Sequence, residues 1–348
     1  MDKQFTAKSH YVPKFYLRYW SKDGTTVQVY RTVVKTKSDD LWKSYSIKSI
    51  PKIKDLYTSL SDNSDCDSLE NWFNTKIEAP ASVVIQNIIN DKHLSKEQYD
   101  ILIRYAAAQI VRTPKFYLKS EKFINDNFND IASEGIKASE KQIENYTDKE
   151  LLSALKRTNS NLDNQLCPIQ AHLVTNTQSP YVKVEALTER KMWQYNITHL
   201  LTSTEKILHN HKWSIIKAPS GFNWATSDDP VLCLNYRDEK HYDFNGGWGR
   251  KNCDIIFPLT PDYLMFTEVG NRKTIKQFNL RTCLLIQQMI IEHAFLYVFS
   301  KDPIKGMCHF HPRKTDINLY NEKVGIWENW GDYQRNIERI WNNSLLKL

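Results

Sequence analysis

Glycine and proline are scarce in this chain, with 10 and 12 residues among 348. Collagen-like and low-complexity proteins contain far more of both, so these classes are excluded. Long apolar runs are also missing, and no stretch approaches the roughly 18 apolar residues of a membrane-spanning helix. The first ten residues contain no apolar segment of the kind that signal peptides carry. We therefore expect a protein without a signal peptide or a membrane span.

Cysteine is infrequent and follows no pattern. The six cysteines are scattered without a repeated spacing, at positions 66, 167, 233, 253, 283 and 308. Scattered cysteines in a long chain are typical of a reduced compartment, so we expect a cytoplasmic protein without a disulfide framework.

The short motifs of well-known catalytic and cofactor sites are also lacking. The sequence holds no Walker loop, dinucleotide glycine fingerprint, His-Glu-x-x-His or Gly-x-Ser-x-Gly. Cys308-His-Phe-His311 resembles a metal-binding tract, but no Cys-x-x-Cys completes the four ligands of a zinc site. Gly246-Gly-Trp-Gly249 does not have the spacing of a phosphate loop. Any site must therefore be assembled from residues that lie far apart in the sequence.

The composition is that of a folded, mildly basic protein. Apolar residues make up 41% of the chain and aromatic residues 12%, which argues against disorder and supplies a sizeable core. Lysine and arginine number 47 against 40 acidic residues, giving a net charge of +7. This excess permits a nucleic acid, a nucleotide or another anionic partner without demanding one.

The most informative stretch runs from Asn223 to Leu234. Two short apolar segments, predicted as strands, flank Ser227, Asp228 and Asp229, and Pro230 stiffens the bend by fixing its own backbone. One interpretation is a structural turn in which an aspartate caps backbone amides. The other is a metal-binding, acid–base or ligand-binding role for the two carboxylates.

A second stretch, His10 to Trp20, is rich in aromatic residues and ends at a turn before a predicted strand over 26–32. Its spacing fits a short helix as well as a strand. His10 lies outside any periodic segment, so it is either structural or an acid–base residue, because histidine titrates nearest to neutral pH.

Helices are predicted between residues 68 and 118. A helix begins at Ser68 and is interrupted at Pro80, where we expect a kink or a fresh start that leaves Glu78 at the break. Ser95-Lys-Glu-Gln98 is a capping box, and the helix that it opens ends near Arg112. An arginine at this position either complements the helix dipole or binds an anionic group with its planar guanidinium.

We expect an α+β fold with a mixed or antiparallel sheet packed on helices. The sheet is built mainly from residues 213–300 and joined by the N-terminal hairpin, with helices over 68–118 and 274–292 against it. One domain spans 1–302, a helical insertion or lid spans 119–183, and a helix spans 184–209. A tryptophan-rich C-terminal extension, 303–348, packs on this domain. A short strand is predicted near 46–50.

Five sequence blocks, in this order, carry a resemblance to a known family: His10-Tyr-Val-Pro13 with Phe15-Tyr-Leu-Arg18, the Glu78 segment, Val111-Arg-Thr-Pro114, Thr226-Ser-Asp-Asp-Pro-Val231 and Phe257-Pro-Leu-Thr-Pro261. Their order and spacing from about residue 10 to 299 resemble the DUF4238 family of bacterial proteins. The family name implies no activity. It directs attention to the polar residues that the blocks contain.

These residues suggest a hydrolase acting on a phosphodiester, most plausibly a nuclease-like toxin or anti-phage effector. Glu78, Asp228 and Asp229 are candidate ligands for Mg²⁺ or Mn²⁺, since hard ions prefer carboxylate oxygens. His10 is the candidate base, and Arg112 with Asp228 completes the catalytic set. Candidate substrate-binding residues are Arg18, Gln109 and Ser227. The alternative is a non-catalytic module that binds or senses nucleic acid or a nucleotide. A nucleotide-consuming effector has no fingerprint in the sequence.

Overall fold

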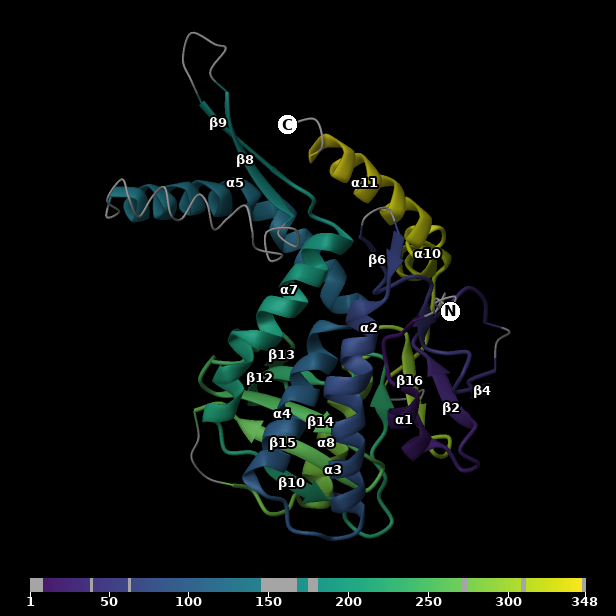
Figure 1. Cartoon of the computed structure of the whole chain (residues 1–348). Coiled ribbons are helices and arrows are strands. Elements are labelled where there is room, and N and C mark those ends of the chain that lie inside the picture. The colour runs from purple at the N-terminus through teal and green to yellow at the C-terminus, as the bar shows by residue number, and fades with distance from the viewer. Residues whose placement is uncertain are drawn as a thin grey trace.

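Helices and antiparallel strands alternate along the chain, which confirms the predicted α+β class (Figure 1). The computed structural model describes residues 9–37, 40–61, 64–144, 168–174, 181–270, 274–307 and 311–345. In this part of the chain, no helix combines the length and apolar character needed to cross a membrane.

The largest sheet has five strands in the order β10-β15-β14-β12-β13, and all its pairs are antiparallel. Its strands are β10 (Ser214–Lys217), β12 (Leu232–Asp238), β13 (His241–Asp243), β14 (Cys253–Pro258) and β15 (Tyr263–Glu268). Four of these strands coincide with segments that the sequence predicts as strands, because apolar residues lie there between turn residues. The fifth, β13, lies in a segment that the sequence predicts as an aromatic loop.

Helices cover both faces of this sheet. Alternate side chains of a strand point to opposite faces, so Ile255 and Phe257 face one helical layer and Ile256 faces the other. The helices on the first face are α3 (Ala79–Ile89), α4 (Lys96–Val111) and α7 (Arg190–Thr202), and α8 (Leu280–His293) covers the second. The rings of Tyr105 and Phe257, with centroids 5.4 Å apart, show how α4 meets the sheet.

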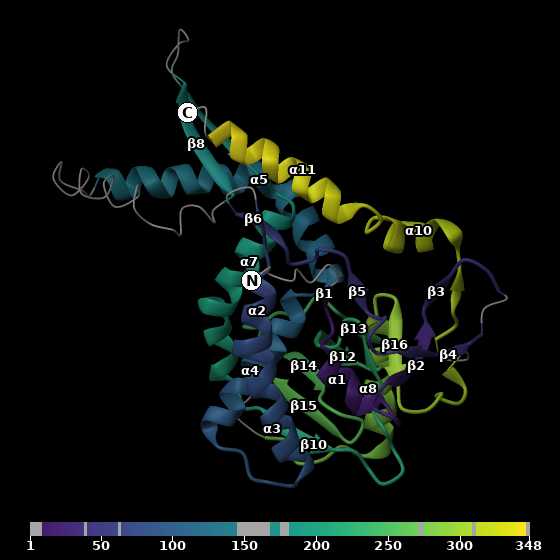
Figure 2. The ribbon, with the colours of Figure 1, turned by 45° about the vertical axis from the view of Figure 1, so that its right-hand side comes forward.

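The strand β2 of the predicted N-terminal hairpin belongs to a second sheet, and not to the five-stranded sheet as predicted. This sheet has the order β11-β16-β2-β4 and is also antiparallel (Figure 2). Its strands are β2 (Thr26–Arg31), β4 (Trp42–Ser46), β11 (Thr226–Ser227) and β16 (Tyr297–Ser300). The two-residue strand β11 lies directly before the Asp228-Asp229 turn, and so the turn sits between the two sheets.

Short elements complete the N-terminal region. The strand predicted near 46–50 lies earlier in the chain, because β4 ends at Ser46 and residues 47–49 form a turn. The short elements are β1 (Ser9–His10), α1 (Lys14–Leu17), the 3₁₀ turn η1 (Arg18–Trp20), β3 (Val33–Val34), β5 (Lys52–Ile53), β6 (Ser59–Ser61), β7 (Ser64–Cys66) and β17 (Lys314–Thr315). The pair β17–β3 is parallel, which makes the strand set mixed as a whole.

The interruption predicted at Pro80 is a π-helical turn. Helix α2 (Ser68–Trp72) continues through η2 (Phe73–Glu78), which is π-helical, into α3. Proline has no backbone N–H to donate and its ring crowds the preceding turn, so it is tolerated in the first turn of a helix. Here Pro80 lies in the first turn of α3, and the wider π turn directly before it takes up the irregularity.

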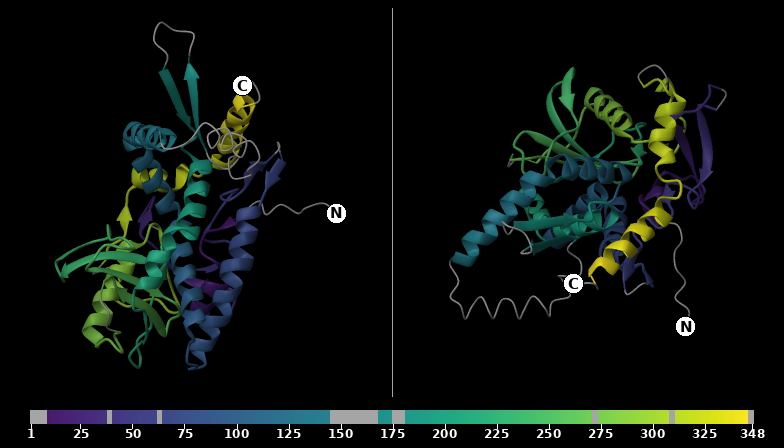
Figure 3. Two further views of the ribbon diagram at one scale, coloured as in Figure 1. Left: turned by 60° about the vertical axis from the view of Figure 1, so that its left-hand side comes forward. Right: turned by 90° about the horizontal axis from the view of Figure 1, so that it is seen from above.

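The segment predicted as a helical insertion is only partly helical. Helix α5 (Pro114–Glu144) extends away from the sheets, and the hairpin of β8 (Ile169–Val174) and β9 (Tyr181–Ala186) stands beside it (Figure 3). The predicted helix over 184–209 is wrong at its start, because 184–186 belong to β9. It is divided into α7 and the 3₁₀ segment η4 (Thr204–Asn210). The sequence Thr147-Asp-Lys-Glu150 has the form of a capping box and predicts a further helix start, and it lies outside the described residues.

The C-terminal extension forms α10 (Ile317–Gly325) and α11 (Trp330–Leu345) and packs on the N-terminal end of α7. Glu338 of α11 accepts two hydrogen bonds from the Arg190 guanidinium, at 2.8 and 2.9 Å. Both side chains are excluded from solvent. Trp330 is buried, and its ring lies beneath the same guanidinium with 5.6 Å between the guanidinium carbon and the ring centroid.

Candidate functional site

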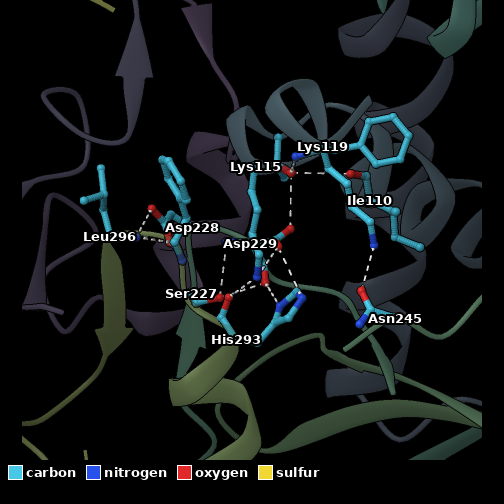
Figure 4. Close-up of polar contacts among 12 residues, drawn as sticks. Ile110, Lys115, Lys119, Ser227, Asp228, Asp229, Asn245, His293 and Leu296 are labelled. Carbon is cyan, nitrogen blue, oxygen red and sulfur yellow. Dashed lines mark hydrogen bonds and ion pairs between the residues drawn. The ribbon is translucent and has the colours of Figure 1, made fainter. Parts of the chain in front are cut away.

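The Asp228-Asp229 turn is closed locally by Ser227. The Ser227 hydroxyl donates to the Asp229 carbonyl oxygen at 2.8 Å and accepts from the Asp229 backbone N–H at 3.2 Å. These bonds within the turn hold the chain so that the two adjacent carboxylates point in different directions (Figure 4). Ser227 is fully buried, and its hydroxyl has a structural role in the turn. Its contact with substrate stays a prediction.

The Asp228 carboxylate has a structural role. It accepts hydrogen bonds from the backbone N–H groups of Phe295 and Leu296, at 2.9 Å each for the shortest contacts. Its own N–H donates to the Tyr297 carbonyl oxygen at 3.0 Å. Burial raises the pKa of Asp228 to about 7. Asp228 thus fastens the end of β11 to the start of β16, in line with the structural interpretation of the turn.

Asp229 faces the other way, into a group of polar side chains from α5, α8 and the α4–α5 connection. Lys115 Nζ lies 3.2 Å from Asp229 Oδ2, and His293 Nε2 lies 3.3 Å from the same oxygen. The Thr113 hydroxyl donates to Oδ1 at 3.2 Å. Lys115 Nζ also donates to the His293 carbonyl oxygen at 2.6 Å, which ties the lysine to both partners. We call Lys115, Asp229 and His293 the Asp229 cluster.

The protonation states within the Asp229 cluster follow from its contacts. Burial lowers the pKa of His293 to about 4, although the Asp229 carboxylate acts in the opposite direction. The neutral imidazole donates from Nδ1 to the Asp229 carbonyl oxygen at 3.0 Å, which leaves the lone pair on Nε2. At neutral pH the cluster therefore holds one ammonium, one carboxylate and one basic nitrogen beside the carboxylate.

The cluster is buried on one side and open on the other. The side chains of Asp229 and His293 are less than a tenth exposed, whereas that of Lys115 is 37% exposed. Phe244 covers the imidazole with its ring centroid 5.0 Å away. A ligand from solvent therefore meets the lysine first.

Sequence reasoning overlooked Lys115 and His293. Lys115 directly follows the Val111–Pro114 block and lies in the first turn of α5, because Pro114 begins that helix. His293 is the last residue of α8, one position beyond the predicted helix end. The available signal for Lys115 was its place directly after a motif block, and for His293 it was a polar residue at the end of a predicted helix.

Arg112 forms a separate buried group with Glu78. The guanidinium donates to Glu78 Oε1 at 2.6 Å and to the His10 carbonyl oxygen at 2.8 Å. It lies over the Phe73 ring at 4.5 Å, and the Tyr57 hydroxyl bonds the Arg112 carbonyl oxygen. Arg112 is only 2% exposed, so these contacts hold the N-terminal segment against α4 and the π turn. Its role in neutralising phosphate stays a prediction.

Within the described part of the chain, the side chains of the other predicted residues make no hydrogen bond or ion pair with either group, although the His10 backbone bonds Arg112. Burial, with the nearby Lys14 and Lys52, lowers the pKa of His10 to about 4, and its imidazole faces the backbone at residues 47–48. Arg18 is exposed on η1, and its guanidinium meets no partner among the described residues. Gln109 is fully buried in α4, and neither of its amide atoms has a hydrogen-bond partner within the described ranges.

The structure therefore brings together Arg112 with Glu78, and Ser227 with Asp229, but not the whole predicted set. Glu78, Asp228 and Asp229 bond different groups and do not converge. Among the described residues, no group of three or more His, Cys, Asp or Glu side chains is arranged to hold a metal ion.

The comparisons with known proteins confirm the family resemblance. The family model described as "Protein of unknown function (DUF4238)" matches residues 8–303. No curated protein and no solved structure matches the chain. The match includes Lys115, Asp229 and His293 and ends before α10 and α11.

Proposed function

This chain belongs to the DUF4238 family, and from the geometry of its polar groups we propose that it is a cytoplasmic hydrolase of phosphodiester bonds, with the Asp229 cluster as its active site. The observation that carries the proposal is the meeting of an ammonium, a carboxylate and a neutral imidazole within 3.3 Å, drawn from α5, the β11–β12 turn and α8. Phosphodiester cleavage needs a base for the nucleophile and positive charge beside the phosphate oxygens.

Each side chain has a role that follows from its position, although burial makes His293 a weaker base than an ordinary histidine. His293 Nε2 takes a proton from the attacking water as the new P–O bond forms. Asp229 then stabilises the imidazolium, because its carboxylate lies 3.3 Å from that nitrogen. Lys115 Nζ, the exposed member, neutralises the charge that develops on the phosphate oxygens. As the P–O bond to the leaving alcohol breaks, His293 returns the proton to the leaving oxygen, so atoms and charges balance.

Mg²⁺ or Mn²⁺ remains part of the proposal. Asp229 is the carboxylate nearest the proposed reaction, whereas the carboxylates of Glu78 and Asp228 are held by Arg112 and by backbone N–H groups. A metal bound there would need further ligands from the substrate and water.

The test is incubation of purified protein with RNA, single-stranded DNA, duplex DNA and free nucleotides, each with Mg²⁺, with Mn²⁺ and with a chelator. We expect His293→Gln and Lys115→Met each to lower the cleavage rate by about 10²-fold or more, the typical effect of removing a general base or a charge-stabilising group. Matched controls are His209→Gln, because His209 also pairs with an aspartate (Asp100, 2.7 Å), and Lys217→Met, because Lys217 pairs with Asp91.

Cleavage that survives undiminished in both cluster variants would remove the proposed active site. If cleavage is lost only in the reactions with chelator, the reaction depends on a metal ion. If cleavage is unchanged with chelator, the reaction needs no metal ion. Melting temperatures of all variants separate lost chemistry from lost folding.

The competing function is a binding or sensor module for nucleic acid or a nucleotide. It is favoured by one observation, namely that Arg112, Glu78 and Asp228 are all engaged by scaffold groups. Retention of an oligonucleotide without any cleavage, under all the conditions above, would support this function instead.

A further inference from the structure

A polar groove lies at the edge of the five-stranded sheet, where the β12–β13 hairpin meets the start of β14. It has a volume of about 520 Å³, and its lining includes Asn235, Arg237, His241, Arg250 and Lys251. Three of these five residues carry a permanent positive charge. The groove is formed by described elements of the rigid sheet and by the loop that precedes β14.

The positive charges of this groove are largely unused within the chain. The side chains of Arg237 and Lys251 are exposed and make no hydrogen bond, ion pair or ring contact with any residue that the structure describes. Arg250 makes only a long hydrogen bond, 3.4 Å, to the Asn245 carbonyl oxygen.

The acids beside the groove are already engaged. Asp243, which also lines it, accepts from the Asn235 side chain and the Asn245 backbone N–H, at 2.8 Å each. Asp238 is held by His241. Asp243 interacts electrostatically with Arg250, whereas Arg237 and Lys251 pair with no carboxylate among the described residues. Three cationic side chains thus line the groove with one carboxylate, and this excess of positive charge favours an anionic ligand.

A line of cations joins this groove to the Asp229 cluster. Lys119 follows Lys115 by one helical turn on α5, so both project from the same side. Lys119 Nζ donates to Asn245 Oδ1 at 3.2 Å (Figure 4). Arg250 donates to the backbone carbonyl oxygen of the same asparagine at 3.4 Å. The sequence of positive groups is thus Lys115, Lys119, Arg250 and then the groove.

The loop that carries Asn245 is anchored where it passes the sheet. Gly246 donates its N–H to the Cys233 carbonyl oxygen at 3.0 Å, and a Cβ at this position would lie 2.7 Å from the Cys233 backbone. Only glycine permits this approach. The close contact fixes Asn245 between Lys119 and Arg250, so the line of cations does not depend on a loose loop.

We propose that the line from Lys115 to Lys251 binds the phosphates of a single-stranded nucleic acid and leads one of them to the Asp229 cluster. The exposed ring of Tyr236 beside the groove offers a surface on which a base can stack. This inference rests on the proposed function in one respect, namely that the strand leads to the Asp229 cluster as the active site. Its binding component is tested separately from cleavage.

The experiment measures binding of fluorescein-labelled single-stranded RNA and DNA by anisotropy at several salt concentrations, with His293→Gln in every arm to prevent cleavage. The groove variant is Arg237→Gln with Lys251→Gln. Its charge-matched control is Lys92→Gln with Lys96→Gln, two exposed lysines at the α3–α4 connection. Each phosphate contact on a single strand contributes about 0.7 to the slope of log K against log salt, so the groove variant should lower the slope by about 1.4 and weaken binding about 20-fold at 0.1 M salt. The control should change neither quantity.

Competition with ATP, inorganic pyrophosphate and polyglutamate identifies the ligand class. Weak competition by all three supports a nucleic acid strand. Competition by ATP or pyrophosphate as effective as the unlabelled oligonucleotide would replace the strand by a small phosphate ligand, and equal competition by polyglutamate would overturn phosphate recognition.

The two proposals fail in different ways. Unchanged affinity and salt slope in the groove variant would overturn the cation line, even if wild-type protein cleaves RNA through His293. A lowered slope with no cleavage by the wild-type protein would retain the cation line and remove the hydrolase.

Discussion

Arg190 and Glu338 form a bidentate ion pair from which water is excluded, with donor–acceptor distances of 2.8 and 2.9 Å. The pair joins α7, inside the region that matches the family model, to α11, which lies outside it. The third guanidinium contact, Nη1 to the Asp55 carbonyl oxygen, adds the N-terminal region to the same junction. The extension is thus fastened to two distant parts of the chain at one point.

We predict that Glu338→Ala lowers the free energy of unfolding by about 3–5 kcal/mol, because it leaves the Arg190 charge buried and unpaired. The double variant Arg190→Met with Glu338→Leu should be much less destabilised, since no charge is left without a partner. Urea denaturation measures both. Glu239→Ala, which breaks the exposed Arg281–Glu239 pair, is the control and should have little effect. Equal stability of Glu338→Ala and wild type would contradict the prediction.

Gln109→Met should raise the free energy of unfolding by about 1 kcal/mol, because the glutamine buries two amide atoms without partners among the described residues. Gln98→Met is a useful contrast, since Gln98 completes the capping box of the same helix and its loss should destabilise the protein. Thermal or urea unfolding measures the difference. A clear loss of stability in Gln109→Met would contradict the prediction and would show that the amide contributes to folding.

Asp254→Asn should change how stability depends on pH. Burial, and then the neighbouring Glu268 carboxylate, raise the pKa of Asp254 to about 7 from an ordinary 3.8. Between these two pKa values the folded state keeps a proton that the unfolded state has lost. Asp254 therefore contributes to the free energy of unfolding of the wild-type protein a component that decreases as the pH rises through this range. The variant lacks this component. Urea denaturation at pH 4.5, 6 and 8 should therefore show the variant gaining on the wild type as pH increases, and a constant difference would refute the assignment.

Arg112→Met and Glu78→Met should each destabilise the protein, by about 3 kcal/mol for the arginine, because each leaves a buried charge unpaired. Their double variant should cost less than the sum of the two. A double-mutant cycle from urea denaturation measures this coupling. Additive effects would mean that the 2.6 Å contact does not govern the stability of either group.

Much of the fold follows from local patterns. The strand Tyr263–Glu268 has the predicted bounds, and the capping box at Ser95 starts its helix as expected, because alternation and caps act within a few residues. The last three residues of β9, 184–186, were taken into the helix that follows, because so short a run does not show a strand period. The pairing of β2 with β16 spans most of the chain, and nothing local specifies it.

The candidate site was less predictable for the same reason. The Asp228-Asp229 turn was recognisable from its proline and its flanking strands, but the opposite directions of its two carboxylates depend on what surrounds them. Lys115 and His293 are 178 positions apart and meet only because α5 begins where α8 ends. Arg112 and Glu78 were expected at the catalytic and metal-binding site because of their chemistry. In the structure they form a buried ion pair with each other.

Asp228 and Asp229 are covalently consecutive, yet one carboxylate holds the amides that open β16 and the other receives Lys115 and His293. The backbone N–H groups of Phe295 and Leu296 are consequently built-in reporters. Hydrogen–deuterium exchange at these two amides should slow when an anion occupies the neighbouring lysine, even though no ligand touches them.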